Sequence, residues 1–208
     1  MIFPYLSKVI ILTAVLHTIL ALDKCRDTDN ANCQSCGNTV YPRDEIYRQN
    51  CMRSCGVCTV TNVAYNKTTN QSSTFITSAG DTRSLPYHAV DGNIGQVWGS
   101  TTSSCSHTLD GSPSWWCVDL QQIYNIDSIK LFNRDILQGR LRGFEIKISS
   151  GDQCDESGFN SATSCHNDTT PINQSIYSIE SCDLQQSISA RTVFVSNKIV
   201  TLCEVQIF

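Results

Sequence analysis

The sequence has little of what several large classes of protein require. Lys and Arg number 15 against 19 Asp and Glu in 208 residues, and the formal charge of −4 argues against a nucleic-acid partner, which needs a basic surface. No apolar run after residue 21 is long enough to form a transmembrane segment. The motifs of zinc proteases, serine hydrolases, P-loop proteins and dinucleotide enzymes are missing, so we expect no catalytic residues and no enzyme. Because 40% of the residues are hydrophobic, a disordered chain is disfavoured as well.

The N-terminal segment, residues 1–21, predicts a secretory signal peptide. An apolar run from Val9 to Ala21 follows Lys8, and the small residue Ala21 comes shortly before Asp23. The run is short for a spanning helix, and an uncleaved anchor is the weaker alternative. We therefore expect a secreted, extracellular protein.

Twelve cysteines remain after residue 21, an even number far above cytosolic usage, and they predict several disulfides. The first six lie in a short polar stretch that cannot bury enough apolar area to fold without crosslinks: Cys25, Cys33, Cys36, Cys51, Cys55 and Cys58. Two CxxC pairs in this stretch also fit a four-thiolate zinc site. Zinc is disfavoured because two cysteines would be left over and export is oxidising.

The motifs Cys51-Met-Arg-Ser-Cys55-Gly-Val-Cys58 and Cys25-Arg-Asp27 resemble the ShKT domain, a disulfide-rich module related to sea-anemone potassium-channel toxins, over residues 25–58. The resemblance implies the disulfides Cys25–Cys58, Cys33–Cys51 and Cys36–Cys55. The toxins block channels with a Lys-Tyr pair, where this chain has Glu45-Ile46-Tyr47-Arg48. We therefore expect a structural or partner-docking role for this N-terminal module instead of channel block.

From Thr59 onward, short runs of alternating or β-branched residues are separated by Gly, Asn, Asp, Ser and Pro. The candidate strands are Trp115–Leu120, Ile126–Phe132, Phe144–Ile148, Arg191–Val195 and Leu202–Phe208. No long amphipathic helix is evident. The pattern predicts a mainly β domain, an antiparallel sandwich or barrel.

Four motifs in this half, in this order, resemble the F-type lectins, a branch of the discoidin-like galactose-binding fold. They are Asn62-Val-Ala64, His88-Ala-Val-Asp91-Gly92-Asn93, Trp115-Trp116-Cys117-Val118-Asp119-Leu120 and Leu202-Cys203-Glu204-Val205. The resemblance covers residues 62–208. It implies an eight-stranded antiparallel β-jelly-roll sandwich, a site for terminal L-fucose in the loops at one end, and a calcium ion nearby.

The resemblance assigns the sugar site to His107, Arg134, Asp135 and Arg140. Arginine presents forked, permanently charged donors to sugar oxygens, and histidine adds one directional nitrogen. This chain has Arg134 directly before Asp135, where the family has a residue between them. The alternative is that the arginines, with Arg142, are solvated loop charges and that His107 bonds only its own loop.

Apolar contact with the sugar is expected from Ile136-Leu137, because the adjacent cysteine pair of some F-type lectins is absent here.

For calcium, the resemblance implies two carboxylates and several mainly backbone ligands: His88, Asp91, Asn93, Ser104, Cys203 and Glu204. The alternative for Asp91-Gly92-Asn93 is a plain turn. Glu204 argues against it, because a carboxylate in an otherwise apolar strand usually has a partner.

The second six cysteines form the remaining disulfides. The resemblance implies Cys105–Cys203 and Cys165–Cys182, and Cys117–Cys154 follows by elimination. Four sequons make Asn66, Asn70, Asn167 and Asn173 candidate glycosylation sites. All four are far in sequence from His107 and Arg134, which predicts that glycans leave the sugar site unmasked.

Together these features predict a secreted, calcium-containing lectin that recognises fucosylated glycans in innate recognition or cell adhesion. A discoidin-like adhesion module that binds protein or lipid is one alternative, and a venom or channel-directed protein carrying a lectin domain is another. Because a single sugar site binds weakly, a homo-oligomer is expected.

Overall fold

The computed structural model describes residues 61–99, 105–180, 182 and 188–208 of the chain. The predicted signal peptide, the ShKT-like module with its three disulfides, and Ser104 lie outside the described residues. Residues 61–208 form one compact unit.

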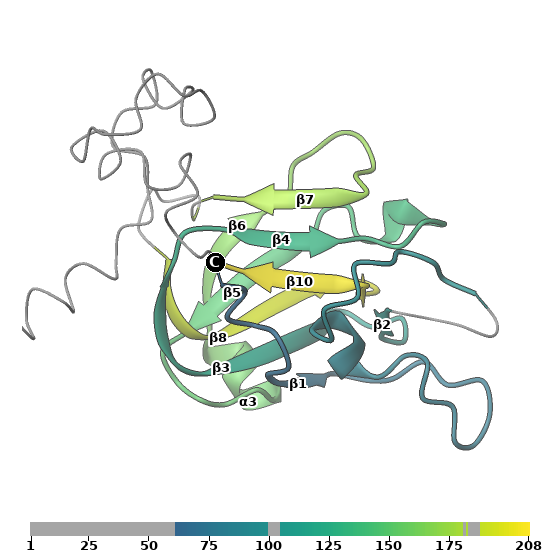
Figure 1. The fold of residues 1–208 in the computed structure, drawn as a ribbon, viewed down its shortest axis with the longest axis horizontal. Coiled ribbons are helices and arrows are strands. Elements are labelled where there is room, and N and C mark those ends of the chain that lie inside the picture. The colour runs from purple at the N-terminus through teal and green to yellow at the C-terminus, as the bar shows by residue number, and fades with distance from the viewer. Residues whose placement is uncertain (1–60, 100–104, 181, 183–187) are drawn as a thin grey trace, which may run out of the picture. The chain divides into compact units, whose positions relative to one another are not determined.

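Two antiparallel sheets form a sandwich (Figure 1). The larger sheet has the strand order β1-β3-β8-β5-β6, with β1 Thr68–Gln71, β3 Ser114–Ile126, β8 Ile188–Asn197, β5 Glu145–Ser149 and β6 Thr163–Asn167. The smaller sheet has the order β10-β4-β7, with β10 Glu204–Ile207, β4 Ile129–Phe132 and β7 Ile176–Ile179. A two-stranded ribbon pairs β2 Ser106–His107 with β9 Thr201–Leu202. The prediction of a mainly β antiparallel sandwich is confirmed.

The core lies between the two sheets and consists of the inward-facing side chains of both. Trp116, Val118 and Leu120 alternate along β3, and Leu131 and Val205 face them from the smaller sheet within one buried cluster. Strands with a period of two bury one face in this way, and the alternation in the sequence is the signal of it.

The prediction of one strand from Ile126 to Phe132 is wrong. β3 ends at Ile126 and β4 begins at Ile129. Between them the backbone N–H groups of Asp127 and Ser128 donate to the carbonyl of Phe208, at 2.6 and 3.3 Å. The chain therefore crosses from one sheet to the other here, and the apolar residues on either side made two strands look like one.

Helical structure is sparse in the described residues. It consists of the 3-10 turns η2 Pro86–Ala89 and η3 Gln138–Arg140 and the short helix α3 Glu156–Ser161. The carboxylate of Asp155 caps α3 by accepting from the N–H of Gly158 at 2.8 Å. No helix in the described part of the chain is long and apolar enough to cross a membrane.

Three disulfides join distant segments of this unit: Cys105–Cys203, Cys117–Cys154 and Cys165–Cys182. They are the three pairs that the sequence predicts for its second half.

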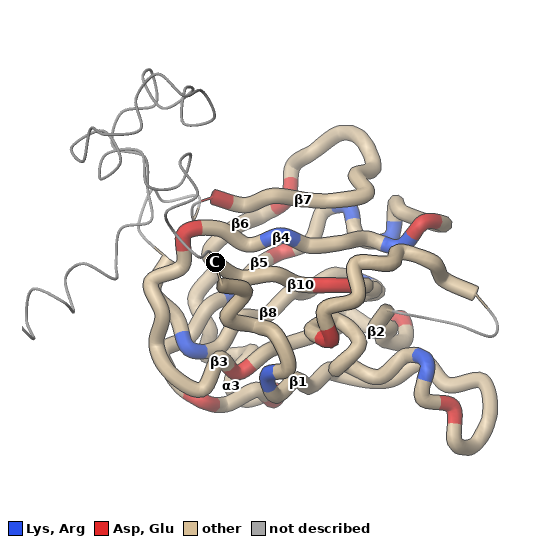
Figure 2. The backbone as a smooth tube through the Cα atoms, viewed as in Figure 1, with Lys and Arg blue, Asp and Glu red and all other residues tan. Residues whose placement is uncertain are grey.

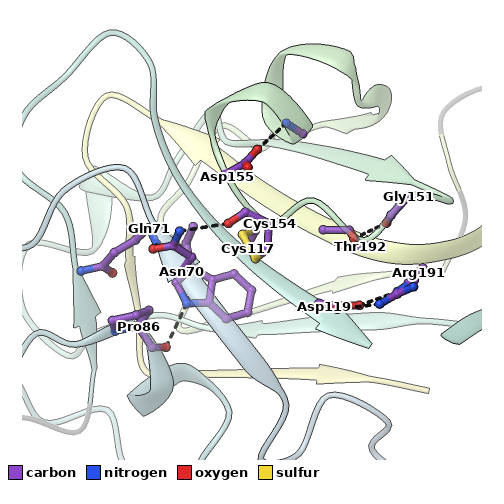
Figure 3. The surroundings of a disulfide bond; sticks show 12 residues. Asn70, Gln71, Pro86, Cys117, Asp119, Gly151, Cys154, Asp155, Arg191 and Thr192 are labelled. Atoms are coloured by element: carbon purple, nitrogen blue, oxygen red, sulfur yellow. Dashed lines mark hydrogen bonds and ion pairs between the residues drawn. A yellow bond between two sulfur atoms is a disulfide. The ribbon is translucent and has the colours of Figure 1, made fainter. Parts of the chain in front are cut away.

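Figure 3 shows how Cys117–Cys154 ties the segment before α3 to the larger sheet. On one side Asn70 Nδ2 donates to the Cys154 carbonyl at 3.0 Å. On the other, Arg191 bonds Asp119 through two nitrogen–oxygen contacts at 2.8 and 3.1 Å.

One end of the sandwich collects the loops that matter for function. β4 ends there, and β7 and β10 begin there, as the arrows in Figure 1 show. Lys and Arg lie among Asp and Glu at this end (Figure 2). The segment before β2, the β4–β5 loop and the β6–β7 loop meet at this end, on a scaffold that the sheets and disulfides hold.

Candidate functional site

The structure brings together the three basic residues that the sequence singles out. His107 lies on β2, Arg134 follows β4 after one residue, and Arg140 ends η3. Arg140 Nη1 is 3.3 Å from His107 Nε2, and both arginines act electrostatically on the His107 ring. Residues up to 33 positions apart therefore form one cluster, which we call the His107 cluster.

His107 is buried, with 4% of its surface exposed. Its Nδ1 lies 2.6 Å from the Thr108 carbonyl, so the proton is assigned to Nδ1 and Nε2 is left as an acceptor. Burial, together with the positive charges of Arg134 and Arg140, lowers the pKa of His107 to about 4, although the hydrogen bond to Thr108 opposes this shift. At neutral pH the ring is uncharged. The ring bonds the Thr108 carbonyl of its own loop through Nδ1, and its Nε2 faces Arg140. The alternative that His107 bonds only its own loop therefore does not account for all of its contacts.

Arg134 is a buried cation whose hydrogen-bonding capacity is only partly used. The residue is 2% exposed, and its Nε and Nη1 have no hydrogen-bond partner among the described residues. The guanidinium lies 4.5 Å from the ring centroid of Trp98, and burial lowers the Arg134 pKa to about 10. A buried charge with free N–H groups is costly, and ligand oxygens would relieve that cost. Arg134 is therefore not a solvated loop charge.

The loop that carries Arg134 is fixed by its neighbour Asn133. The Asn133 carboxamide oxygen accepts from the Arg134 N–H at 2.9 Å, and its Nδ2 donates to the carbonyls of Gln138 and Gln174. Arg140 is exposed, but the backbone around it is held by Asn197, whose Nδ2 donates to the carbonyls of residues 140, 141 and 142. The scaffold thus fixes the backbone and leaves the side chain of Arg140 accessible.

Asp135 contacts the backbone of the segment that carries Trp98. Its carboxylate accepts from the Trp98 N–H at 3.1 Å, and its own N–H donates to the Gln96 carbonyl at 2.8 Å. Asp135 therefore places Trp98 under Arg134, and this contact gives it a positioning role.

An aromatic wall that the sequence analysis missed completes the cluster. The ring centroid of His107 lies 4.8 Å from that of Phe75 and 4.7 Å from that of Trp98. Both aromatics come from loops with no periodic pattern, so only their residue type could have marked them. Aromatic faces commonly pack against the apolar carbons of a ligand while polar groups fix its orientation.

An open pocket of about 370 Å³ adjoins this wall. Its lining is Phe75, Thr77, Asp81, Arg83, Ser84, Trp98, Gly99 and Ile136. Ile136 thus provides apolar surface where the sequence predicts it, whereas Leu137 is exposed and does not line this pocket. The Arg83 guanidinium bonded to Asp81 holds the pKa of that carboxyl well below its usual range, so both stay charged.

Two of the residues predicted to hold calcium, Asp91 and Glu204, lie near each other next to β10, whereas Ser104 lies outside the described residues. Glu204 is fully buried, and its carboxylate accepts from the Gly92 N–H at 3.2 Å. Burial, together with the negative charge of Asp91, raises the pKa of Glu204 to about 7, although the hydrogen bond from the Gly92 N–H opposes this shift. His88 Nδ1 lies 3.4 Å from the Asp91 carboxylate, and the Asn93 side chain accepts from Gly95.

Asn173 lies closer in space to the predicted sugar site than its separation in the sequence suggests. A methyl group added at Gly139 would lie 3.3 Å from Asn173 Oδ1, so the Asn173 side chain packs against η3 beside Arg140. Sequence separation is a poor guide here because the β6–β7 loop folds back onto the β4–β5 loop. The other acceptors lie elsewhere, at the β1 side (Asn66, Asn70) and at the end of β6 (Asn167).

Comparison with known proteins places the domain in a family. Residues 88–195 match the family described as NedA-like, galactose-binding domain, and the chain belongs to that family.

Among curated proteins, the chain is similar to Fucolectin-5 of Anguilla japonica, with 39% identity over 100 residues, 48% of this chain and 50% of the relative. The chain thus spans about half the length of the curated relatives it matches.

Two solved structures are similar over most of the described unit. A fucolectin from the serum of Morone saxatilis, the striped bass, has 30% identity and a TM-score of 0.59 over 70% of this chain and 47% of that one. The lectin domain of lectinolysin, complexed with Lewis b antigen, has 25% identity and a TM-score of 0.56 over 72% of this chain and 96% of that one. These similarities support the resemblance to F-type lectins over the second half of the chain, and they do not extend to the ShKT-like module.

Proposed function

We propose that residues 61–208 bind terminal fucose on glycans through His107, Arg134 and Arg140. The observation that carries the proposal is the buried guanidinium of Arg134, two of whose nitrogens have no hydrogen-bond partner among the described residues, beside a neutral histidine and an aromatic wall. A hydroxyl group can donate to His107 Nε2 while its oxygen accepts from the N–H groups of the arginines. The names of the similar proteins, fucolectins and a lectin domain bound to Lewis b antigen, favour fucose as the sugar.

The apolar part of the site suits the same ligand. Fucose has a methyl group and a face of ring C–H groups, which need apolar contact instead of hydrogen bonds. Phe75, Trp98 and Ile136 offer that contact next to the polar cluster. In this proposal the sugar binds directly to the protein, with no step that breaks a bond.

Calcium is the second part of the proposal. Among the described residues no group of three or more His, Cys, Asp and Glu could hold a metal. The residues suit a calcium ion held by oxygen ligands. In this proposal the buried Glu204 and the nearby Asp91 supply the negative charge. The backbone carbonyl oxygens of His88, Asn93 and Cys203 supply the remaining ligands. A cation there would neutralise the carboxylate pair and stabilise the turn after η2 against β10. Secretion, a role in innate recognition or adhesion, glycosylation and homo-oligomers stay proposals of the same kind.

A lipid surface is a second candidate ligand. Ile136 and Leu137 are 50% and 58% exposed at the same loops, beside the exposed Arg140. Apolar tips with adjacent basic side chains are typical of proteins that dock to anionic membranes.

A glycan array separates these possibilities. We expect the secreted wild type to bind fucosylated glycans and to be displaced by free L-fucose, and His107→Ala to lose the signal. Vesicles with and without phosphatidylserine provide the second arm. Binding to vesicles but to no glycan would overturn the fucose proposal in favour of lipid, and binding to neither would remove both.

A further inference from the structure

The loop between β6 and β7 carries the sequon Asn173-Gln174-Ser175 and lies against the loop of the His107 cluster. The Ser175 carbonyl accepts from the Asn133 N–H at 2.9 Å and from Gln96 Nε2. The Gln174 carbonyl accepts from Asn133 Nδ2 at 2.9 Å. Figure 1 shows this loop leading into β7 at the end of the sandwich where β4 ends.

The acceptor side chain itself lies next to Arg140. Asn173 Nδ2 would be 3.7 Å from a methyl group added at Gly139, and Gly139 directly precedes Arg140. Arg140 in turn reaches to within 3.3 Å of His107 Nε2. The amide of Asn173 therefore lies against Gly139, the residue directly before Arg140, whose side chain belongs to the proposed sugar site.

The acceptor is also accessible. Asn173 is exposed, and so is its neighbour Ile172, at 63%. Asn70 differs, because it lies within β1 and its Nδ2 donates to the Cys154 carbonyl at 3.0 Å. Of these two acceptors, Asn173 offers the amide that a glycosylating enzyme can reach in a loop.

We propose that Asn173 carries an N-linked glycan that covers the Arg140 side of the site and limits which fucosylated ligands can enter. The inference rests on the proposed function. Attachment forms a bond between Asn173 Nδ2 and the anomeric carbon of a lipid-pyrophosphate-linked oligosaccharide. The bond from that carbon to the pyrophosphate breaks, and Nδ2 loses a proton. An N-glycan is bulky, so it blocks ligands whose further sugars extend toward Arg140. Ligands that extend toward the pocket at Phe75 and Trp98 stay free to bind.

The test uses the full chain secreted from cells that glycosylate. Ser175→Ala removes the sequon, whereas Ser175→Thr keeps it. Both variants keep the backbone carbonyl of residue 175, which accepts hydrogen bonds from Asn133 and Gln96, so we expect both to fold as the wild type does. Thr169→Ala removes the sequon at Asn167 and is the control for losing a glycan away from Arg140.

Mass spectrometry should show one N-glycan fewer in Ser175→Ala than in Ser175→Thr. Ser175→Ala should also bind branched, multiply fucosylated glycans about tenfold more tightly than the wild type does. Methyl α-L-fucoside, which is too small to be blocked, should bind all four proteins equally.

An unchanged mass in Ser175→Ala would overturn the inference, and so would equal affinity for branched glycans with the methyl fucoside still binding. Failure of every protein, Ser175→Ala included, to bind any fucoside would instead remove the proposed function and the inference with it.

Discussion

At the scale of single residues, the site depends on burial that changes the chemistry of ordinary side chains. His107 is neutral at pH 7 because burial and two neighbouring guanidinium groups lower its pKa to about 4. Arg134 keeps its charge, but two of its nitrogens have no hydrogen-bond partner in the part of the chain that the structure describes. A neutral acceptor between two strong donors is an arrangement that hydroxyl groups fit well.

The lowered pKa of His107 predicts how sugar binding depends on pH. Affinity for methyl α-L-fucoside should stay constant from pH 7.5 to 5 and fall near pH 4, because protonation removes the Nε2 acceptor and adds a third positive charge. Stability should respond earlier. The unfolded chain takes up this proton near pH 6.5 and the folded chain only near 4, so this histidine's contribution to the free energy of unfolding decreases as pH falls between those values.

Calorimetric titrations at pH 7.5, 5.5 and 4 measure the affinity, with circular dichroism to show that the domain stays folded. Loss of affinity centred near pH 6.5 would show that His107 titrates normally and would contradict the buried, neutral ring.

Part of the site could be read from the sequence and part could not. His107, Arg134 and Arg140 stand at positions that match a known family, so their residue type and order were enough. Phe75 and Trp98 were missed because each is one aromatic residue in an irregular loop. The contact of Asn173 with Gly139 was missed because it depends on how two loops pack, and sequence distance indicated the opposite.

At the scale of elements, short strands are held by connections between distant parts of the chain. β1 pairs with β3 and β3 with β8, and Cys117–Cys154 joins the first part of β3 to the segment before α3. β5 was predicted in outline from its alternation and β8 from its β-branched and aromatic residues. The boundary at Asp127 was not predicted, since apolar residues continue on both sides of that turn.

Removing the Cys117–Cys154 bond should destabilise the domain without removing the site. The bond closes a loop of 37 residues. A crosslink of that length is worth about 4 kcal/mol in the chain-entropy account. The double variant Cys117→Ala, Cys154→Ala should therefore show a reduced free energy of unfolding in urea. It should still bind fucoside at temperatures well below its midpoint.

An unchanged urea midpoint in that variant would contradict a stabilising role for this disulfide. Loss of fucoside binding while the domain is still folded would show that the bond also shapes the site.

The connection between the turn after η2 and β10 should depend on calcium. A chelator should lower the thermal midpoint of the wild type, because the buried Glu204 carboxylate then lacks the cation proposed to neutralise it. Glu204→Gln should abolish the response to calcium, since the neutral amide keeps the shape and loses the charge. Differential scanning calorimetry with and without calcium measures both.

Asp110→Asn, at an exposed carboxylate of a surface ion pair with Lys198, is the matched control and should respond to calcium as the wild type does. A wild-type midpoint that is the same in chelator and in calcium would count against the metal.

At the scale of the whole molecule, the proposed lectin domain is one part of a chain whose first 60 residues lie outside the structural description. One His107 cluster per chain predicts weak binding of a single sugar. Useful avidity then requires several copies on a glycan-bearing surface, which is why homo-oligomers belong to the proposal. The ShKT-like module, with six cysteines of its own, stays a prediction from the sequence.

The most direct test of the central claim is a calorimetric titration of methyl α-L-fucoside into the wild type, Arg140→Ala and Arg142→Ala. Arg140 and Arg142 are both exposed arginines on one loop, so the two variants lose the same charge with little risk to the fold. We predict that the wild type binds, that Arg140→Ala loses affinity about tenfold or more as expected for a charged hydrogen bond, and that Arg142→Ala binds as the wild type does. A wild type that does not bind the fucoside, or equal losses in the two variants, would contradict the account.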